Sequence, residues 1–275
     1  MPEAAQIGNR SAAADACFTF PDTLLTYHEL TRSFCADQYA LQCTQFDQHL
    51  ALVSTLIDAG KLRHDAACIS FDDGHRSNFE LASAGLARHQ LKAIFFITAG
   101  WVGEKSSTMG WKQLAALAKM RHSIQSHGWS HKFLSHCSVS ELDRELKASK
   151  HALEDRLGVA VQSISAPGGR WNRHVIQACQ SAGYEHLYTS DPLPEPIPKY
   201  GILLHGRMMV RRSSRPQDIS KFLIGDGWFW FRLRMRHQLK QSGKRILGEA
   251  RYHALWHAMT RRQSHDTEAV TESMV

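Results

Sequence analysis

The sequence predicts an α/β fold built from repeated strand–helix units, and two observations support this. Short apolar or β-branched runs alternate along the chain with longer segments of helical period, a pattern typical of parallel strands joined by crossover helices. Polar residues that can carry chemistry, among them Asp72 and His127, directly follow predicted strands. Both (β/α) barrels and doubly wound sheets gather their active residues at that place. The 275 residues suffice for one such domain with an appendage.

Five strands and five helices are expected from this alternation. One helix is marked at both ends, because Ser138 and Glu141 match a capping box and Gly158 is a typical stop. Residues 191–198 hold four of the eight prolines and predict an extended loop. The strands are expected at residues 66–71, 92–98, 122–126, 161–166 and 185–189, and the helices at residues 46–59, 77–89, 111–120, 138–157 and 173–182.

The chain divides into three parts by composition. Residues 1–22 are expected to form a mobile N-terminal lead, residues 23–212 the catalytic domain, and residues 213–275 a basic, mainly helical extension rich in aromatic residues. Net charge is +7 overall, yet residues 211–262 carry thirteen Lys and Arg against three acids, a local balance of +10. This region could meet anionic lipid, nucleic acid or an acidic partner, or be a solvated helix packed on the domain. Nucleic acid is the least supported partner, because no known reading motif is present.

The cysteine pattern and the N-terminus bear on location. The six cysteines are scattered without a C-x-x-C pair, which indicates free thiols in a reducing compartment. The first twenty residues lack the apolar core of a signal peptide, and no run approaches the ~20 apolar residues of a spanning helix. We therefore expect a cytoplasmic protein, peripheral at the inner membrane face if the basic extension binds lipid.

Two adjacent acids, Asp72 and Asp73, follow the predicted strand at residues 66–71 and precede Gly74. At a strand end, a glycine turn allows both carboxylates to approach one cavity. A metal ligand and a general base are the natural division of labour, because a cation keeps Asp73 ionised while Asp72 exchanges a proton. The alternative is an ordinary capping turn at a helix start.

A second element, His127 and His131, lies after the third predicted strand. The four-residue separation suits ligation of one metal ion from a single turn or a doubled-back loop. Taken alone, the two histidines could equally be surface or core residues. One carboxylate and two imidazoles leave coordination positions open, as a hydrolytic metal site requires.

A third element is the loop Pro167, Gly168, Gly169 and Arg170 after the fourth predicted strand. Its backbone N–H groups could hold the oxyanion of a tetrahedral intermediate, although a plain turn is equally compatible. Trp129, between the paired histidines, could stack on a sugar or form part of the barrel wall.

With these elements the chain closely resembles the polysaccharide deacetylases, the NodB-homology family of carbohydrate esterases. The resemblance runs from about residue 27 to residue 191 and rests on residues 70–74 (SFDDG), 126–131 (SHGWSH), 166–169 (APGG) and 182–184 (AGY). It implies an irregular (β/α) barrel with Asp72 as catalytic base. It also implies that Asp73, His127 and His131 bind a divalent metal, with zinc favoured over cobalt, nickel or manganese.

Two features depart from the family pattern. The family has an Arg two places before the proline of the third motif and an aromatic residue after it, where this chain has Ser165 and Gly168. Whether Arg170 replaces that Arg is left open. The family also has a late histidine that acts as general acid. His205 is the candidate for it here, and the alternative is a loop or surface histidine.

The resemblance implies a metal-dependent hydrolase that removes an acetyl or related acyl group from a saccharide. We expect an acetylated or lipid-linked glycan precursor of envelope or exopolysaccharide synthesis as substrate. One alternative is a deformylase or amidase acting on an aminosugar lipid or a small molecule. The other is a catalytically impaired glycan-binding or scaffold protein, motivated by the altered third motif.

Overall fold

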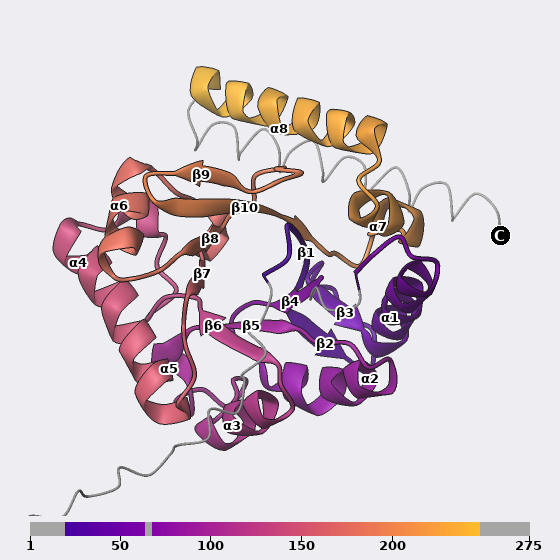
Figure 1. Cartoon of the computed structure of the whole chain (residues 1–275), viewed down its shortest axis with the longest axis horizontal. Coiled ribbons are helices and arrows are strands. Elements are labelled where there is room, and N and C mark those ends of the chain that lie inside the picture. Colours follow the sequence, from indigo (N-terminus) through magenta and orange to yellow (C-terminus); the bar gives the residue numbers. More distant parts are fainter. Residues whose placement is uncertain (1–19, 64–67, 248–275) are drawn as a thin grey trace, which may run out of the picture.

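In the computed structural model, which describes residues 20–63 and 68–247, a closed barrel of seven parallel strands surrounds the centre of the molecule (Figure 1). Closure comes from the pairing of the first strand with the last, in which Thr23 lies opposite Gly206. This closure decides for a barrel and against a doubly wound sheet. The barrel strands are β1 (Thr23–Tyr27), β4 (Ile69–Phe71), β5 (Ile94–Ile97), β6 (Ser123–Ser126), β7 (Ser163–Ser165), β8 (His186–Tyr188) and β10 (Ile202–Met209).

Helices cover the outside of the barrel and coincide with all five predicted helical segments. The capping box is present, since the Ser138 N–H donates to Glu141 Oε2 at 2.9 Å, and Gly158 ends that segment with φ 64°. π-turns at η1 (Asn78–Ala82) and η4 (Arg144–Ala148) interrupt two of the segments. The helices are α1 (Cys43–Asp58), α2 (Ser83–Arg88), α3 (Trp111–Lys119), α4 (Val139–Asp143), α5 (Ser149–Leu157), α6 (Arg173–Ser181) and α7 (Pro216–Leu223).

The five predicted strands are confirmed as β4 to β8. Toward both ends of the chain, the structure contains further strands that were not predicted. The sequence analysis did not anticipate β1, nor the small pair β2 (Glu29–Thr31) and β3 (Ala40–Gln42). The proline-rich loop ends in a short strand, β9 (Ile197–Lys199), antiparallel to β10. Pro198 is tolerated there because β9 is an edge strand and one side needs no N–H donor. The predicted mobile lead falls almost wholly on residues 1–19, outside the described residues.

Two apolar clusters pack the molecule. The large one lies between the strands and the surrounding helices. The small one lies inside the barrel and consists of Leu24, Ile94, Phe96 and Tyr188, all fully buried. Burial on this scale is the dominant stabilising contribution to folding. Asp72, His127 and Arg207 lie together beside the cavity at the carboxyl end of the barrel.

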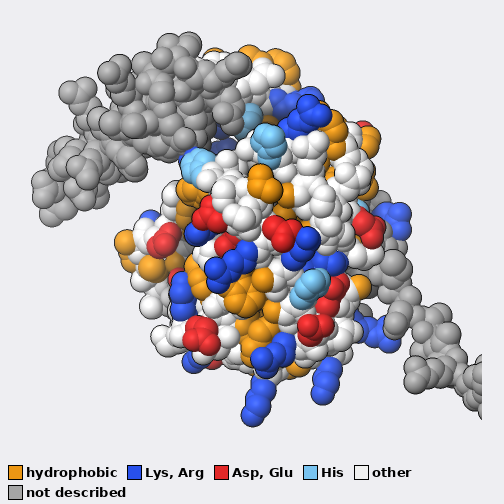
Figure 2. Space-filling view, turned by 90° about the vertical axis from the view of Figure 1, so that its left-hand side faces the viewer, with side chains coloured by type: hydrophobic (Ala, Val, Ile, Leu, Met, Phe, Trp, Pro, Cys, Tyr) orange, Lys and Arg blue, Asp and Glu red, His pale blue; other side chains and the backbone are white. Residues whose placement is uncertain are grey.

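The basic extension is helical as far as it is described. Helix α8 (Gly227–Leu247) lies along the outside of β9 and β10 (Figure 1). Its Trp230 is 3 % exposed, and Phe229 and Leu233 pack against the main core. The face shown in Figure 2 carries interspersed acidic, basic and apolar side chains. Among the described helices, none combines the length and apolar character needed to cross a membrane.

Candidate active site

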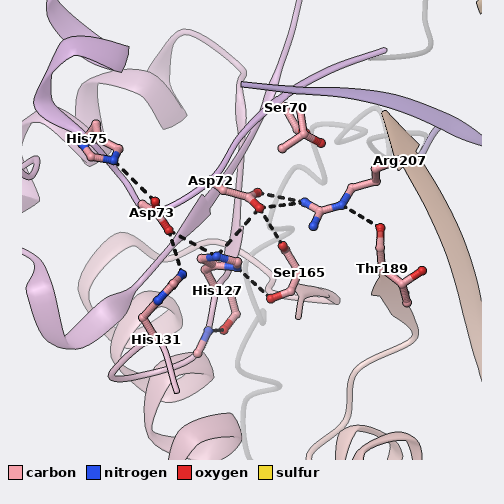
Figure 3. Close-up of polar contacts among 12 residues, drawn as sticks. Ser70, Asp72, Asp73, His75, His127, His131, Ser165, Thr189 and Arg207 are labelled. Carbon is pink, nitrogen blue, oxygen red and sulfur yellow. Dashed lines mark hydrogen bonds and ion pairs between the residues drawn. The ribbon is translucent and has the colours of Figure 1, made fainter. Parts of the chain in front are cut away.

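Two carboxylates project from the carboxyl end of β4. The Asp72 N–H still pairs with the Tyr27 carbonyl at 2.9 Å, so the strand continues to that residue. Asp73 (φ 70°) and Gly74 (φ 83°) then adopt left-handed backbone conformations. Such a conformation is unusual for a residue with a side chain and is retained where surrounding contacts enforce it. It turns both carboxylates toward one cavity, as Figure 3 shows.

Asp73 lies among imidazoles. Its Oδ1 is 3.3 Å from His127 Nε2 and 3.1 Å from His131 Nε2. His75, after the turn, approaches the other oxygen at 3.4 Å. Burial would raise the pKa of Asp73, but the imidazole N–H groups of His127, His131 and His75 outweigh it and hold that pKa far below its ordinary value. Asp73 is therefore an anion.

The two histidines are held by hydrogen bonds behind them. His127 Nδ1 lies 2.8 Å from the Ser165 carbonyl oxygen, so this nitrogen donates and Nε2 is the nitrogen that faces Asp73 and would bind a metal. His131 follows a loop that the buried Glu145 fixes. Glu145 Oε2 accepts the N–H groups of Trp129 and Ser130 at 2.9 and 2.8 Å.

One ligand atom from each of Asp73, His127 and His131 lies within 4.8 Å of the other two. One carboxylate and two imidazoles, one of them oriented by a backbone carbonyl, form a donor set suited to zinc or a similar divalent ion. These residues fit the metal that the sequence analysis predicted. They supply three protein ligands, the number that hydrolytic zinc sites use.

Asp72 has different partners. Both of its carboxylate oxygens lie 2.9 Å from Arg207 Nη1, and Oδ2 also accepts from Ser165 Oγ at 3.1 Å. Burial would raise the pKa of Asp72, but the Arg207 guanidinium and the nearby His127 lower it below its ordinary value. Arg207 is itself fixed, because Nε donates to the Thr189 carbonyl at 3.2 Å. Asp72 is thus an ionised carboxylate 3.8 Å from His127 Nε2, beside the three candidate ligands.

A cavity of about 440 Å³ opens over these groups. Aromatic and charged side chains surround it in addition to the Asp and His residues, which suits a polar ligand with flat faces. The lining residues are His28, Tyr39, Asp72, Asp73, His127, His131, Phe133, Gly168, Gly169, Ser190, Arg207, Met209 and Arg211.

Comparison with known proteins agrees with this geometry. A family model described as polysaccharide deacetylase matches residues 59–187. A chitooligosaccharide deacetylase of Sinorhizobium fredii is 26% identical over 163 residues, 58% of this chain and 71% of that protein. The Bacillus subtilis protein YxkH is 28% identical over 124 residues, 45% of this chain and 44% of its own length. The matched part thus spans less than half of YxkH.

Solved structures share the fold. The Streptococcus pyogenes deacetylase PplD in complex with acetate has a TM-score of 0.60 at 20% identity, covering 73% of this chain and 97% of that one. IcaB from Ammonifex degensii has a TM-score of 0.59 at 18% identity, covering 74% and 97%. Over residues 59–187 the chain is similar to the polysaccharide deacetylase family. Its described barrel has the architecture that the resemblance implied.

Within this barrel, the third motif contacts Asp72 through Ser165 and not through Arg170. Arg170 does not contact Asp72; its guanidinium lies 4.5 Å from the centre of the Phe133 ring. Arg207 from β10 contacts Asp72 instead. The Gly169 N–H donates to the Ala166 carbonyl at 2.7 Å, so it is not free to bind an oxyanion.

The glycines of that motif serve another purpose, which is close packing. A Cβ on Gly168 would lie 2.5 Å from Phe133 Cε1, and one on Gly169 would lie 2.0 Å from Ser190 Oγ. Both glycines also have positive φ. They line the cavity, whereas Pro167 is buried and is not among the lining residues. Their lack of a side chain lets Phe133 and Ser190 border the cavity.

Two predicted residues lie away from the cavity. Trp129 packs its indole against Gly100, where a Cβ would lie 3.0 Å from Nε1, and is a wall residue. His205 is buried in the barrel, and its Nε2 is 2.9 Å from His186 Nδ1. Its ring stacks on Tyr188 with centroids 4.4 Å apart. Neither side chain lines the cavity, so this placement gives no support to a general-acid role for His205.

A cavity residue that the sequence analysis missed is His28, directly after β1. Its Nδ1 is buried and has no hydrogen-bond partner within residues 20–63 and 68–247. Its ring packs on Tyr39 with centroids 5.0 Å apart, and it lines the same cavity as Asp72. The available signal was a histidine at the end of an apolar run, Leu24 to Tyr27, the same signal that identified Asp72.

Proposed function

We propose that this chain is a metal-dependent hydrolase that removes an acetyl or related acyl group from a saccharide. The observation that carries the proposal is the division of two adjacent carboxylates. Asp73 faces two imidazoles, while Asp72 is held apart by Arg207. The family match and the chitooligosaccharide deacetylases among the relatives support the choice of substrate class.

Asp73, His127 and His131 would hold the metal. A divalent ion bound there would polarise the acyl carbonyl and would lower the pKa of the attacking water. Asp72 takes the proton of that water. It suits this task because Arg207 keeps its carboxylate ionised and fixes its orientation.

His28 is our candidate for the proton donor to the leaving group. His28 lines the cavity and its Nδ1 has no partner among the described residues. Burial lowers the pKa of His28, and the carboxylates of Asp72 and Asp73 offset this only in part. A leaving amine or alkoxide must gain a proton as the intermediate collapses, and a positioned imidazole is the commonest donor. His205 cannot reach this cavity without movement of Tyr188 and His186, which pack on it.

The substrate would be a sugar that lies on Phe133 and Tyr39 at the cavity mouth. Aromatic rings offer flat apolar faces that complement the C–H face of a pyranose. A polysaccharide precursor, including a lipid-linked one, fits this open and partly charged cavity. The retained contact between Asp72 and a guanidinium argues against a purely glycan-binding role, because the base remains oriented despite the altered third motif.

The test starts with protein stripped of metal by a chelator. Zinc or cobalt should restore release of acetate from N-acetylated chito-oligosaccharides, measured by mass loss, with metal content measured in parallel. Formylated and O-acetylated sugars in the same assay distinguish the acyl group. Turnover that is unaffected by complete metal removal would contradict the proposal.

A further inference from the structure

An exposed apolar stripe runs along the outer face of α8. Trp228 and Leu239 are each 68 % exposed, Phe231 48 % and Met235 41 %. Their spacings of three, four and four residues place all four on one side of a helix. Ile224, just before the helix, is also exposed. Single exposed apolar residues are normal, but a contiguous row of this kind marks an interaction surface.

The opposite face of α8 attaches the helix to the barrel. Trp230 is buried and its ring packs on Phe222 of α7, with centroids 4.7 Å apart. Phe229 and Leu233 contact the main core. The Asp226 side chain accepts the Phe229 N–H at 2.7 Å and so caps the helix. The stripe residues therefore do not belong to the core, since a separate set of residues docks the helix.

Positive charge borders the stripe. The exposed Arg232 and Arg236 lie on one side of it by helical position, and Arg234 lies on the other. The whole helix has six Lys and Arg and no Asp or Glu. The nearby acids are engaged, because Asp218 pairs with Arg215 at 2.9 Å and Asp226 caps the helix. This contrasts with the face in Figure 2, where acidic and basic groups alternate.

We infer that α8 is an interfacial helix that docks this protein on an anionic phospholipid bilayer. Aromatic and aliphatic side chains on one face, flanked by arginines, match the requirements of a helix lying in the headgroup region. Anionic headgroups complement the positive charge of this helix, whose neighbour Asp218 already pairs with Arg215. Arginine can also pair with phosphate through two parallel N–H donors.

The docked helix would lie beside the active-site cavity. His237 Nε2 on α8 is 3.4 Å from Asp191 Oδ1, and Asp191 also accepts from Trp171 Nε1 at 2.8 Å. Asp191 directly follows Ser190, which lines the cavity. Binding through α8 thus holds the rim of the cavity close to the lipid surface, where a glycan attached to lipid would be presented.

The experiment is co-sedimentation of the full chain with phosphatidylcholine vesicles, with or without phosphatidylglycerol. It needs no substrate, so its outcome is independent of the proposed hydrolysis. We expect binding to the anionic vesicles that weakens with salt, and little binding to phosphatidylcholine alone. Equal partitioning to both compositions, or none to either, would overturn the inference.

Paired variants separate the apolar and the charged contributions. Trp228→Ser with Leu239→Ser should lower partitioning about tenfold or more, because both side chains would enter the interface. Val139→Ser with Met120→Ser is the matched control, since both are exposed elsewhere. All substituted side chains are exposed, so the unfolding temperature should stay near the parent value. An equal loss of vesicle binding in the control pair would contradict the assignment of the stripe as the lipid-binding surface.

For the charges, Arg232, Arg234 and Arg236 changed to Gln should lower partitioning about tenfold and reduce its salt dependence. The matched control removes the same charge from exposed lysines on the other side of the barrel, Lys61, Lys112 and Lys119. Sedimentation velocity without vesicles tests whether a second copy of the chain, and not lipid, covers the stripe. A parent dimer that the stripe variant converts to a monomer would show that a second copy covers the stripe and would overturn the lipid assignment.

Discussion

The barrel contains two groups of histidines that differ in their neighbours. At the carboxyl end, His127 and His131 face the carboxylate of Asp73 and an open cavity. Toward the amino end, His205 hydrogen-bonds His186 and stacks on Tyr188, a member of the small apolar cluster. Both groups use the same kind of side chain on the same barrel. The difference between the two groups therefore comes from the residues around them.

The pKa values of His127 and His205 show the effect of these neighbours. Burial lowers the pKa of both His127 and His205. At His127, the neighbouring Asp72 and Asp73 outweigh burial and raise the pKa above its ordinary value. At His205 the next-largest influence is a second imidazole, so the pKa falls to about 3. Of these two buried histidines, only the one with carboxylates beside it has a raised pKa.

The largest effect is expected from removing that anion. Asp73→Ala should weaken metal binding by more than about 100-fold, since even outer-shell changes cost 10–100-fold. Acyl release should fall with the metal content. Metal analysis after gel filtration measures the loss, with His205→Gln as the control that changes a buried histidine but no ligand. Full metal content in Asp73→Ala would refute the assignment of Asp73 as a metal ligand.

Asp72→Asn should separate the base from the ligands. The amide is nearly isosteric but cannot take a proton, so kcat should fall about 10²–10⁴-fold while metal is retained. Metal content and single-turnover acyl release distinguish the two contributions. Parallel loss of metal would instead make Asp72 a ligand.

Arg207→Gln should shift the acidic limb of the pH–rate profile. Arg207 holds the pKa of Asp72 down against the effect of burial. Without it the pKa rises, the base is protonated at higher pH, and activity is lost at pH values where the parent is active. A stability cost of about 3–5 kcal/mol is also expected, because a buried charge loses its partner. Arg207→Lys should shift the limb less, and Arg170→Gln should not shift it; an unmoved limb in Arg207→Gln would contradict the coupling.

Arg207 also shows where prediction from the sequence ends. Asp72, Asp73 and His127 were predictable because each follows a strand, and strand ends can be recognised from local periodicity. Arg207 lies 135 residues from Asp72, and their contact depends on the register that sets Arg207 opposite Leu24 of β1. Residues 205 and 207 point to the same face of β10, so the sequence could not tell which one reaches the carboxylates.

The same reasoning explains the other differences. The predicted helices and central strands have strong local signals, including the capping box at Ser138. β1 and β10 exist as a pair only because the barrel closes, and that contact is non-local. Glu145, which fixes the His131 loop, resembles any helix-surface acid in the sequence; only the folded chain shows that it is buried.

The smallest effect is expected at the amino-end cluster, and it concerns stability. His205→Gln should leave acyl release unchanged and lower the free energy of unfolding by about 1–3 kcal/mol through the lost hydrogen bond and packing.

His205 should also make the free energy of unfolding of the parent protein depend on pH, with a loss of stability in acid. Between the ordinary pKa of 6.5 and the folded value of about 3, the unfolded chain binds the proton that buried His205 refuses. This stability is therefore complete above pH 6.5 and falls as the pH drops toward 3. Urea unfolding across this range should show a shallower decline for His205→Gln than for the parent, whereas the exposed His151→Gln should follow the parent. Identical slopes for all three proteins would mean that the two histidine groups do not differ in the way their neighbours imply.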